Sequence, residues 1–260
     1  MPTPLVFITG ASSGIGQALA LRYHRAGYRL ALAARRTSEV KTWAEDCGIS
    51  TDSYHVYSAD VANIESIVAA GHDCMARQGL PNIVIANAGI SVGMDTAVRE
   101  DLEVMARTFA TNNTGLAATF HPFVDAMVLR KSGTLVGIGS VAGIRGLPGH
   151  GAYCASKAAV ISYCESLRGE MRPYGVRVVT ISPGYIDTPL TRQNRYSMPF
   201  LMQADDFADR AFQTIAAGKS YRVIPWQMGM VAKLLRMLPN VLFDRLLAGR
   251  PRKRRQGEQQ

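Results

Sequence analysis

The sequence has few of the features that mark secreted, metal-binding or membrane-spanning proteins. Its four cysteines have no CxxC spacing and its five histidines are scattered, which argues against a zinc site and against a disulfide framework. The N-terminus lacks a basic stretch before an apolar run, and no apolar run approaches the roughly 18 residues that a membrane span requires. No internal repeat or low-complexity linker is present. We therefore expect a soluble, cytoplasmic protein that binds no metal.

Most of the chain carries almost no net positive charge, although the net charge of the whole sequence is +9. The first 217 residues carry 19 basic and 18 acidic side chains, whereas residues 218–260 carry ten basic and two acidic ones. A nucleic-acid-binding protein would carry a basic stripe across its folded body. The distribution therefore argues against a nucleic-acid partner. It indicates a nearly neutral body with a cationic C-terminal region.

Short apolar runs alternate along the chain with longer amphipathic segments, and 47% of the residues are hydrophobic. This alternation predicts a parallel sheet with helices on both faces, because each crossover between parallel strands needs a helix. We expect an α/β fold built on a doubly wound parallel sheet of about seven strands. The predicted strands are 5–9, 29–34, 54–58, 83–86, 134–138, 176–181 and 222–224, and the predicted helices are 14–26, 38–47, 63–77, 98–130, 153–172 and 204–217.

The first predicted strand runs directly into a turn rich in glycine and serine, Thr9-Gly10-Ala11-Ser12-Ser13-Gly14-Ile15-Gly16. Glycines let the backbone approach a diphosphate closely, and the N-terminus of the next helix offers unpaired N–H groups and a favourable dipole. Because the turn lies between a strand and a helix at the start of an α/β series, it predicts a dinucleotide site. An ordinary turn rich in glycine and serine is the alternative.

The TGxxxGxG spacing of this turn resembles that of the short-chain dehydrogenase/reductase family, and further motifs follow in the family's order across residues 4–225. One departure is Ala86, where many members have a second Asn before an NAG triplet. The resemblance implies a Rossmann-like oxidoreductase that uses a nicotinamide dinucleotide. The matching motifs are Asn87-Ala88-Gly89 after the fourth predicted strand, Asn112 three residues before Gly115, Ser140 at the end of the fifth strand, Tyr153-Cys154-Ala155-Ser156-Lys157 (YxxxK), and Pro183-Gly184 with Thr188 after the sixth.

Tyr153 and Lys157 are four residues apart on a predicted helix, so they share one face. A Lys ammonium there favours the phenolate and should lower the pKa of Tyr153. Taken singly, such a pair is usually a surface pair, Ser140 a strand-end hydroxyl and Asn112 a buried amide. The resemblance implies catalytic roles for all four. Tyr153 donates the proton, Lys157 also holds the nicotinamide ribose, Ser140 positions the carbonyl, and Asn112 holds a water that links Lys157 to solvent.

The end of the second predicted strand bears on which nicotinamide nucleotide is bound. NAD enzymes usually carry an acid there for the adenosine 2′-hydroxyl, whereas this chain has Ala34 followed by Arg35. Arg35 suits a 2′-phosphate, so NADP(H) is favoured over NAD(H); a solvated arginine is the alternative. The resemblance places Asp60 at the adenine ring, although Asp60 can also cap the next helix. The predicted cofactor-binding residues are Gly10, Ser12, Ser13, Gly14, Ile15, Gly16, Arg35, Asp60, Val61, Asn87, Ala88, Gly89, Tyr153, Lys157, Pro183, Gly184, Ile186 and Thr188.

Residues 185–203 correspond to the family's variable substrate loop and are rich in apolar side chains. They suit a small lipophilic carbonyl compound or alcohol, with packing on the core as an equal alternative. We expect NADPH-dependent reduction of a ketone or aldehyde to an alcohol, or the reverse. The alternative is a catalytically idle dinucleotide-binding sensor. The apolar residues of the loop are Tyr185, Leu190, Tyr196, Met198, Phe200, Leu201 and Met202.

The chain is expected to divide into a catalytic domain, residues 1–225, and an extension, residues 226–260. The extension has amphipathic patterns at 230–238 and 241–247 and a basic cluster at 250–255. Three roles stay open for it: packing on the body or on a subunit partner, peripheral contact with an anionic membrane through residues 227–260, or a solvated tail. The resemblance also implies a homodimer or homotetramer.

Overall fold

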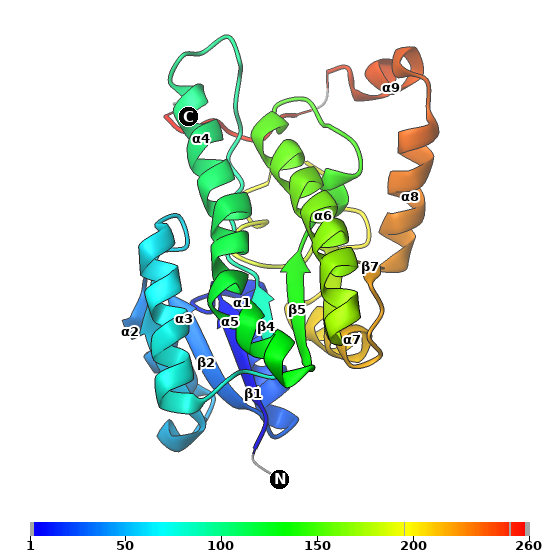
Figure 1. Ribbon diagram of the computed structural model, residues 1–260. Coiled ribbons are helices and arrows are strands. Elements are labelled where there is room, and N and C mark those ends of the chain that lie inside the picture. The colour runs from blue at the N-terminus through cyan, green and yellow to red at the C-terminus, as the bar shows by residue number, and fades with distance from the viewer. Residues whose placement is uncertain (1–2, 195, 250, 258–260) are drawn as a thin grey trace.

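A computed structural model describes residues 3–194, 196–249 and 251–257, so Arg250 of the basic cluster lies outside the described residues. These residues form one seven-stranded sheet in which all paired strands run parallel, in the order β3-β2-β1-β4-β5-β6-β7 (Figure 1). The predicted doubly wound, Rossmann-like fold is therefore confirmed. The strands are β1 (Leu5–Thr9), β2 (Arg29–Ala34), β3 (Tyr54–Ser58), β4 (Ile83–Ala86), β5 (Gly133–Ile138), β6 (Val176–Pro183) and β7 (Tyr221–Ile224).

Helices cover both faces of the sheet because side chains alternate along each strand. On β1, Val6 and Ile8 pack in the core cluster that holds Leu19 of α1, whereas Leu5 and Phe7 pack in the opposite cluster. Near-continuous apolar strands therefore have both of their faces buried. The helices are α1 (Gly14–Arg25), α2 (Thr37–Asp46), α3 (Ile64–Gln78), α4 (Asp101–Phe109), α5 (Gly115–Arg130), α6 (Gly151–Met171), α7 (Ala204–Ala216), α8 (Trp226–Met237) and α9 (Asn240–Leu247).

The sheet order reverses between β1 and β4, which are paired neighbours. In such sheets ligands bind outside the carboxyl ends of the strands at this reversal. The glycine-rich turn follows β1, and Asn87-Ala88-Gly89 follows β4. Both predicted motifs therefore meet at the same edge of the sheet.

The single helix predicted over 98–130 is wrong in detail. The structure has α4, a π-helical turn at Ala110–Thr114, and then α5. The π-helical turn contains Asn112, whose side-chain amide forms hydrogen bonds with Ile90 and Ser156 and does not face solvent. Such turns insert an extra residue into a helix and are common at functional sites. Hydrophobic periodicity does not reveal them, because it continues on both sides.

The extension folds as α8 and α9 and packs part of its surface on the body. Met228 lies against Gly184, and Phe243 is buried under the Arg145 guanidinium, whose carbon lies 3.7 Å from the ring centroid. Arg145 also donates a hydrogen bond of 2.8 Å to the Leu238 carbonyl oxygen. Within the described residues, no helix is long and apolar enough to cross a membrane.

Candidate cofactor and catalytic site

The glycine-rich turn has a backbone that only glycine adopts easily at two positions. Gly10 and Gly14 have φ angles of +69° and +57°, in the left-handed region. A Cβ on Gly16 would overlap the Gly10 carbonyl oxygen, so the third glycine allows α1 to begin directly against the turn. Among the described residues, Ser13 has no side-chain partner that caps α1. The first N–H groups of α1 are thus available to an anion.

The turn after β4 braces the glycine-rich turn. Thr9 Oγ1 accepts hydrogen bonds from the backbone N–H groups of Asn87 and Ala88, at 3.1 and 3.2 Å. Asn87 Nδ2 donates to the Thr9 carbonyl oxygen at 3.0 Å. Asn87 is therefore a positioning residue for the turn. Its side chain makes these bonds although Ala86 stands where many family members have a second Asn.

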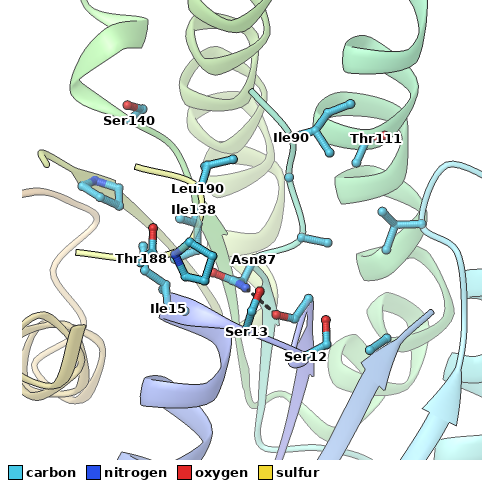
Figure 2. A pocket seen from close by; sticks show the side chains of 18 of the residues that line it. Ser12, Ser13, Ile15, Asn87, Ile90, Thr111, Ile138, Ser140, Thr188 and Leu190 are labelled. Atoms are coloured by element: carbon cyan, nitrogen blue, oxygen red, sulfur yellow. Dashed lines mark hydrogen bonds between the residues drawn. The ribbon is translucent and has the colours of Figure 1, made fainter. Parts of the chain in front are cut away.

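A groove of about 700 Å³ runs along this edge of the sheet. Figure 2 shows Ile15 and Thr188 on one side of it and Ile90 and Thr111 on the other, with Ser12 and Ser13 below and Ser140 toward one end. The predicted site residues that line the groove are Gly10, Ser12, Ser13, Gly14, Ile15, Arg35, Asp60, Val61, Asn87, Ala88, Gly89, Ser140, Tyr153, Lys157, Pro183, Gly184, Ile186 and Thr188.

Two arginines, Arg35 and Arg36, line the groove directly after β2. Arg35 Nη1 is 3.8 Å from Asp60 Oδ2, in an exposed ion pair. Arg36 Nη2 donates to Ser12 Oγ at 3.2 Å, and its Nη1 also pairs with Glu39. Arg36 therefore reaches the glycine-rich turn and lines the groove beside Arg35. We did not predict a role for Arg36, although its position next to Arg35 was a signal for one.

Ser140 and Tyr153 come together at the other end of the groove. Ser140 follows β5 and opens a short 3₁₀ turn, Val141–Gly143, in which a Cβ on Gly143 would overlap the backbone of α6 at Lys157. This close approach brings Ser140 against α6. Burial raises the pKa of Tyr153, and a hydrogen bond with Ser140 opposes that shift. Tyr153 therefore stands as a protonated hydroxyl at neutral pH.

The expected lowering of the Tyr153 pKa by Lys157 is not found. Lys157 Nζ donates to the Ile138 carbonyl oxygen at 2.8 Å and lies 5.9 Å from the centroid of the Tyr153 ring. Burial lowers the pKa of Lys157 to about 8, since the side chain is only 5% exposed. The net direction for Tyr153 is upward, opposite to our expectation, because burial outweighs the opposing contributions.

Asn112 and Gly16 are the two predicted site residues that do not line the groove. Asn112 Nδ2 donates to the Ile90 carbonyl oxygen at 3.0 Å and to Ser156 Oγ at 2.9 Å, and its Oδ1 accepts from the Ile90 N–H at 2.8 Å. It therefore holds the segment after Gly89 in place. The groove has further lining residues that sequence reasoning missed, including Ile90, Val92, Arg107 and Thr111. Thr111 adjoins Asn112, which was the one available signal.

The fold and the groove define a class of protein, the Rossmann-like dinucleotide-binding proteins. The residues present fit a nicotinamide dinucleotide, because the turn leaves no room for a Cβ at Gly16 and cations flank the groove. Within the described part of the chain, no group of His, Cys, Asp or Glu side chains could hold a metal ion.

Comparison with known proteins gives the family. The family model for short chain dehydrogenase matches residues 4–198. An uncharacterized oxidoreductase of Myxococcus xanthus (strain DK1622) is 38% identical over 237 residues, which cover 91% of this chain and 93% of that protein. The chain therefore belongs to the short-chain dehydrogenase family, whose members are oxidoreductases that depend on NAD(P).

Two solved structures share the fold. A short-chain dehydrogenase from Sphingobium yanoikuyae in complex with NADPH aligns with a TM-score of 0.74 and 25% identity, over 91% of this chain and 97% of that one. A 3-ketoacyl-(acyl-carrier-protein) reductase from Brucella melitensis complexed with NADH aligns with a TM-score of 0.76 and 23% identity, over 85% and 96%. Because these neighbours hold different nucleotides, the fold alone does not select NADPH or NADH.

Proposed function

We propose that the protein reduces a ketone or aldehyde to an alcohol with NADPH, and that residues 1–225 form the catalytic domain. The observation that supports this most is that Tyr153 and Ser140 lie together in the lining of the dinucleotide groove, where the Tyr153 hydroxyl can act as an acid. Reduction of a carbonyl requires a proton for the oxygen that becomes an alkoxide. A catalytically idle sensor needs the groove but has no use for this acid.

The nicotinamide nucleotide supplies the hydride when it is bound. The glycine-rich turn and the N-terminus of α1 bind its diphosphate, and the Lys157 ammonium binds the ribose hydroxyls. Ser140 orients the substrate carbonyl, and Tyr153 donates its proton to the carbonyl oxygen. Asn112 orders the segment after Gly89, and we retain the proposal that it also holds a water between Lys157 and solvent.

The preference for NADPH rests on the two arginines at the adenosine end. A guanidinium forms paired hydrogen bonds with phosphate, and Ala34 offers no carboxylate to repel a 2′-phosphate. We expect Arg35→Ala and Arg36→Ala each to raise the Kd for NADPH about tenfold while the Kd for NADH stays within about twofold. Arg99→Ala, which removes an exposed arginine of the body, is the control.

The test of the function is a panel of carbonyl compounds assayed for NADPH and NADH consumption. NADPH-dependent turnover of a lipophilic ketone or aldehyde supports the proposal. A preference for NADH, or unchanged NADPH binding in both arginine variants, would overturn the cofactor assignment. Binding of NADPH without turnover of any carbonyl or alcohol would favour the sensor.

For partners, we propose a homo-oligomer through the α4–α6 region and, separately, peripheral contact between the extension and an anionic membrane. We define the α8–α9 face as the exposed apolar side chains of these two helices. Exposed Lys233, Arg236 and Arg245 accompany this face. In a two-fold contact between copies these cations would meet one another, whereas anionic lipid would complement them. The α8–α9 face comprises Trp226, Met230, Val231, Leu234, Met237, Val241, Leu242 and Leu246.

A further inference from the structure

The C-terminal strap, residues 251–257, is part of the folded body and not a free tail. Figure 1 shows the red end of the chain crossing to the top of α4. The Gly93 N–H donates to the Arg254 carbonyl oxygen at 3.0 Å, and Arg255 Nε lies 2.6 Å from the Asp101 carboxylate, which is only 2% exposed. A Cβ on Gly93 would overlap the Lys253 carbonyl oxygen. The strap therefore has a specific packing site on the body, formed by Gly93 and Asp101.

The segment that receives the strap adjoins the groove. Ile90 and Val92, on either side of Ser91, both line the groove. Two residues further on, the Met94 N–H donates to the Gly149 carbonyl oxygen at 3.1 Å, and its sulfur accepts from the Ala152 N–H at the start of α6. The strap thus packs on residues 91–93, between the lining of the groove and the start of α6.

Lys253 points from the strap into this region. Its Nζ donates to Ser91 Oγ at 3.0 Å, and within the described residues it forms no ion pair with a carboxylate. Burial lowers its pKa to about 8. A half-buried ammonium without a counterion costs free energy, part of which a bound anion would recover. Such a cation is a candidate recognition group.

The surroundings of Lys253 connect it to the reaction centre. Burial lowers the pKa of His150, and the nearby charge of Lys253 lowers it further. His150 Nε2 lies 3.3 Å from Tyr196 Oη in the predicted substrate loop. Burial raises the pKa of Tyr196, with Tyr185 and Tyr153 adding to that shift. His150 and Tyr196 are thus in contact with each other, and they lie within electrostatic reach of Lys253 and of Tyr153, respectively.

We propose that Lys253, with Ser91 and His150 beside it, binds an anionic group of the substrate, a carboxylate or a phosphate, at a distance from the carbonyl that is reduced. This inference rests on the proposed reductase function and names its substrate class. The apolar loop 185–203 would hold the hydrocarbon part between the two ends. The Arg255–Asp101 pair and the Gly93 backbone bond already anchor the strap. The Lys253 ammonium, which is bonded only to Ser91 among the described residues, can therefore also bind a ligand.

The test measures binding of decanoate, decyl phosphate and neutral decanol to the full chain loaded with NADP⁺, by calorimetry. The variant is Lys253→Met, and the matched control is Arg254→Gln, which removes an exposed cation from the same strap. In the wild type we expect at least one anion to bind about tenfold more tightly than decanol, as charge-assisted hydrogen bonds imply. Lys253→Met should bring that ratio within about twofold, and Arg254→Gln should leave it unchanged.

Comparison of decanoate with decyl phosphate shows whether the site prefers a carboxylate or a phosphate, and either result supports the proposal. An anion preference that survives Lys253→Met, or that Arg254→Gln removes equally, would overturn it, as would equal binding of all three probes. Unchanged melting temperatures and unchanged decanol binding show that the variants keep the strap folded.

A second measurement separates this inference from the proposed function. It compares kcat/KM for a medium-chain oxo acid and for its methyl ester. If both are reduced equally well and Lys253→Met changes nothing, the anion site fails and the reductase stands. If the anions bind through Lys253 but no compound of the carbonyl panel, the oxo acid and its ester included, is turned over, the anion site stands and the proposed function fails.

Discussion

The body and the extension bury their apolar side chains to very different degrees. In the body, strands such as β1 are covered on both faces, and the first 217 residues are nearly neutral. The extension has eight of the eighteen large apolar side chains that are exposed among the described residues, together with most of the excess positive charge. The difference underlies our proposal that the body carries out the chemistry and that the extension serves recognition, through its outer face and through the strap.

The largest expected effect is on the proton donor of the body. Tyr153→Phe removes the hydroxyl that we propose as the acid, so kcat should fall by about 10²–10⁴, the range for general acid catalysis. The Kd for NADPH should stay within about threefold, because the groove is intact. The control is Tyr163→Phe, on an exposed part of α6. Near-normal turnover by folded Tyr153→Phe would remove the acid from the mechanism.

The second effect tests the tight turn of the body. In Gly16→Ala the new Cβ would overlap the Gly10 carbonyl oxygen, so the unfolding free energy should fall by about 1–3 kcal/mol and the Kd for NADPH should rise at least about tenfold. Thermal melts with and without NADPH measure both. Gly169→Ala is the control, since a Cβ there would meet no described atom within 4 Å apart from the adjacent residues and backbone of α6, and it should stabilise α6 by about 0.5–1 kcal/mol. Equal NADPH protection in the two variants would contradict the role of the turn.

The third effect concerns the α8–α9 face. The double variant Leu234→Glu with Met237→Glu places two carboxylates at side chains that are 64% and 80% exposed, so sedimentation with phosphatidylserine vesicles should fall at least about fivefold. Leu129→Glu, at a body residue that is 83% exposed, should leave sedimentation unchanged. If the wild type ignores the vesicles, the membrane proposal is wrong. If the double variant halves the molar mass in light scattering, the face is a subunit interface.

The smallest effect compares two lysines, the buried Lys157 in the body and the half-buried Lys253 in the strap. Burial lowers the pKa of each to about 8, so both ammonium groups lose their charge as the pH rises through 8. Affinity for NADPH and for decanoate should therefore both fall between pH 7 and pH 9, by about tenfold at most. Lys253→Met should abolish the pH dependence for decanoate alone. If Lys253→Met also abolished the pH dependence of NADPH binding, the two lysines would not act separately.

Much of the fold was predictable because its signals are local. The glycine-rich turn, the apolar strands and the YxxxK spacing each depend on residues close together in the sequence, and the groove brought the predicted motifs together. The π-helical turn at Asn112 was not predictable, since hydrophobic periodicity continues through it. The raised pKa of Tyr153 was also missed, because burial is a property of the packed site and not of the spacing to Lys157.

The sequence by itself determined the class of fold, the family and the position of the dinucleotide turn, since short-range spacing and alternation carry that information. It also showed that the positive charge lies near the C-terminus. Only the tertiary structure decided what that region contacts. Arg255 reaches Asp101, and Lys253 reaches Ser91, across more than 150 residues of chain. Such pairings arise from the packing of distant segments, so the cationic tail expected from composition is instead a strap packed beside the groove, where we propose that it binds substrate.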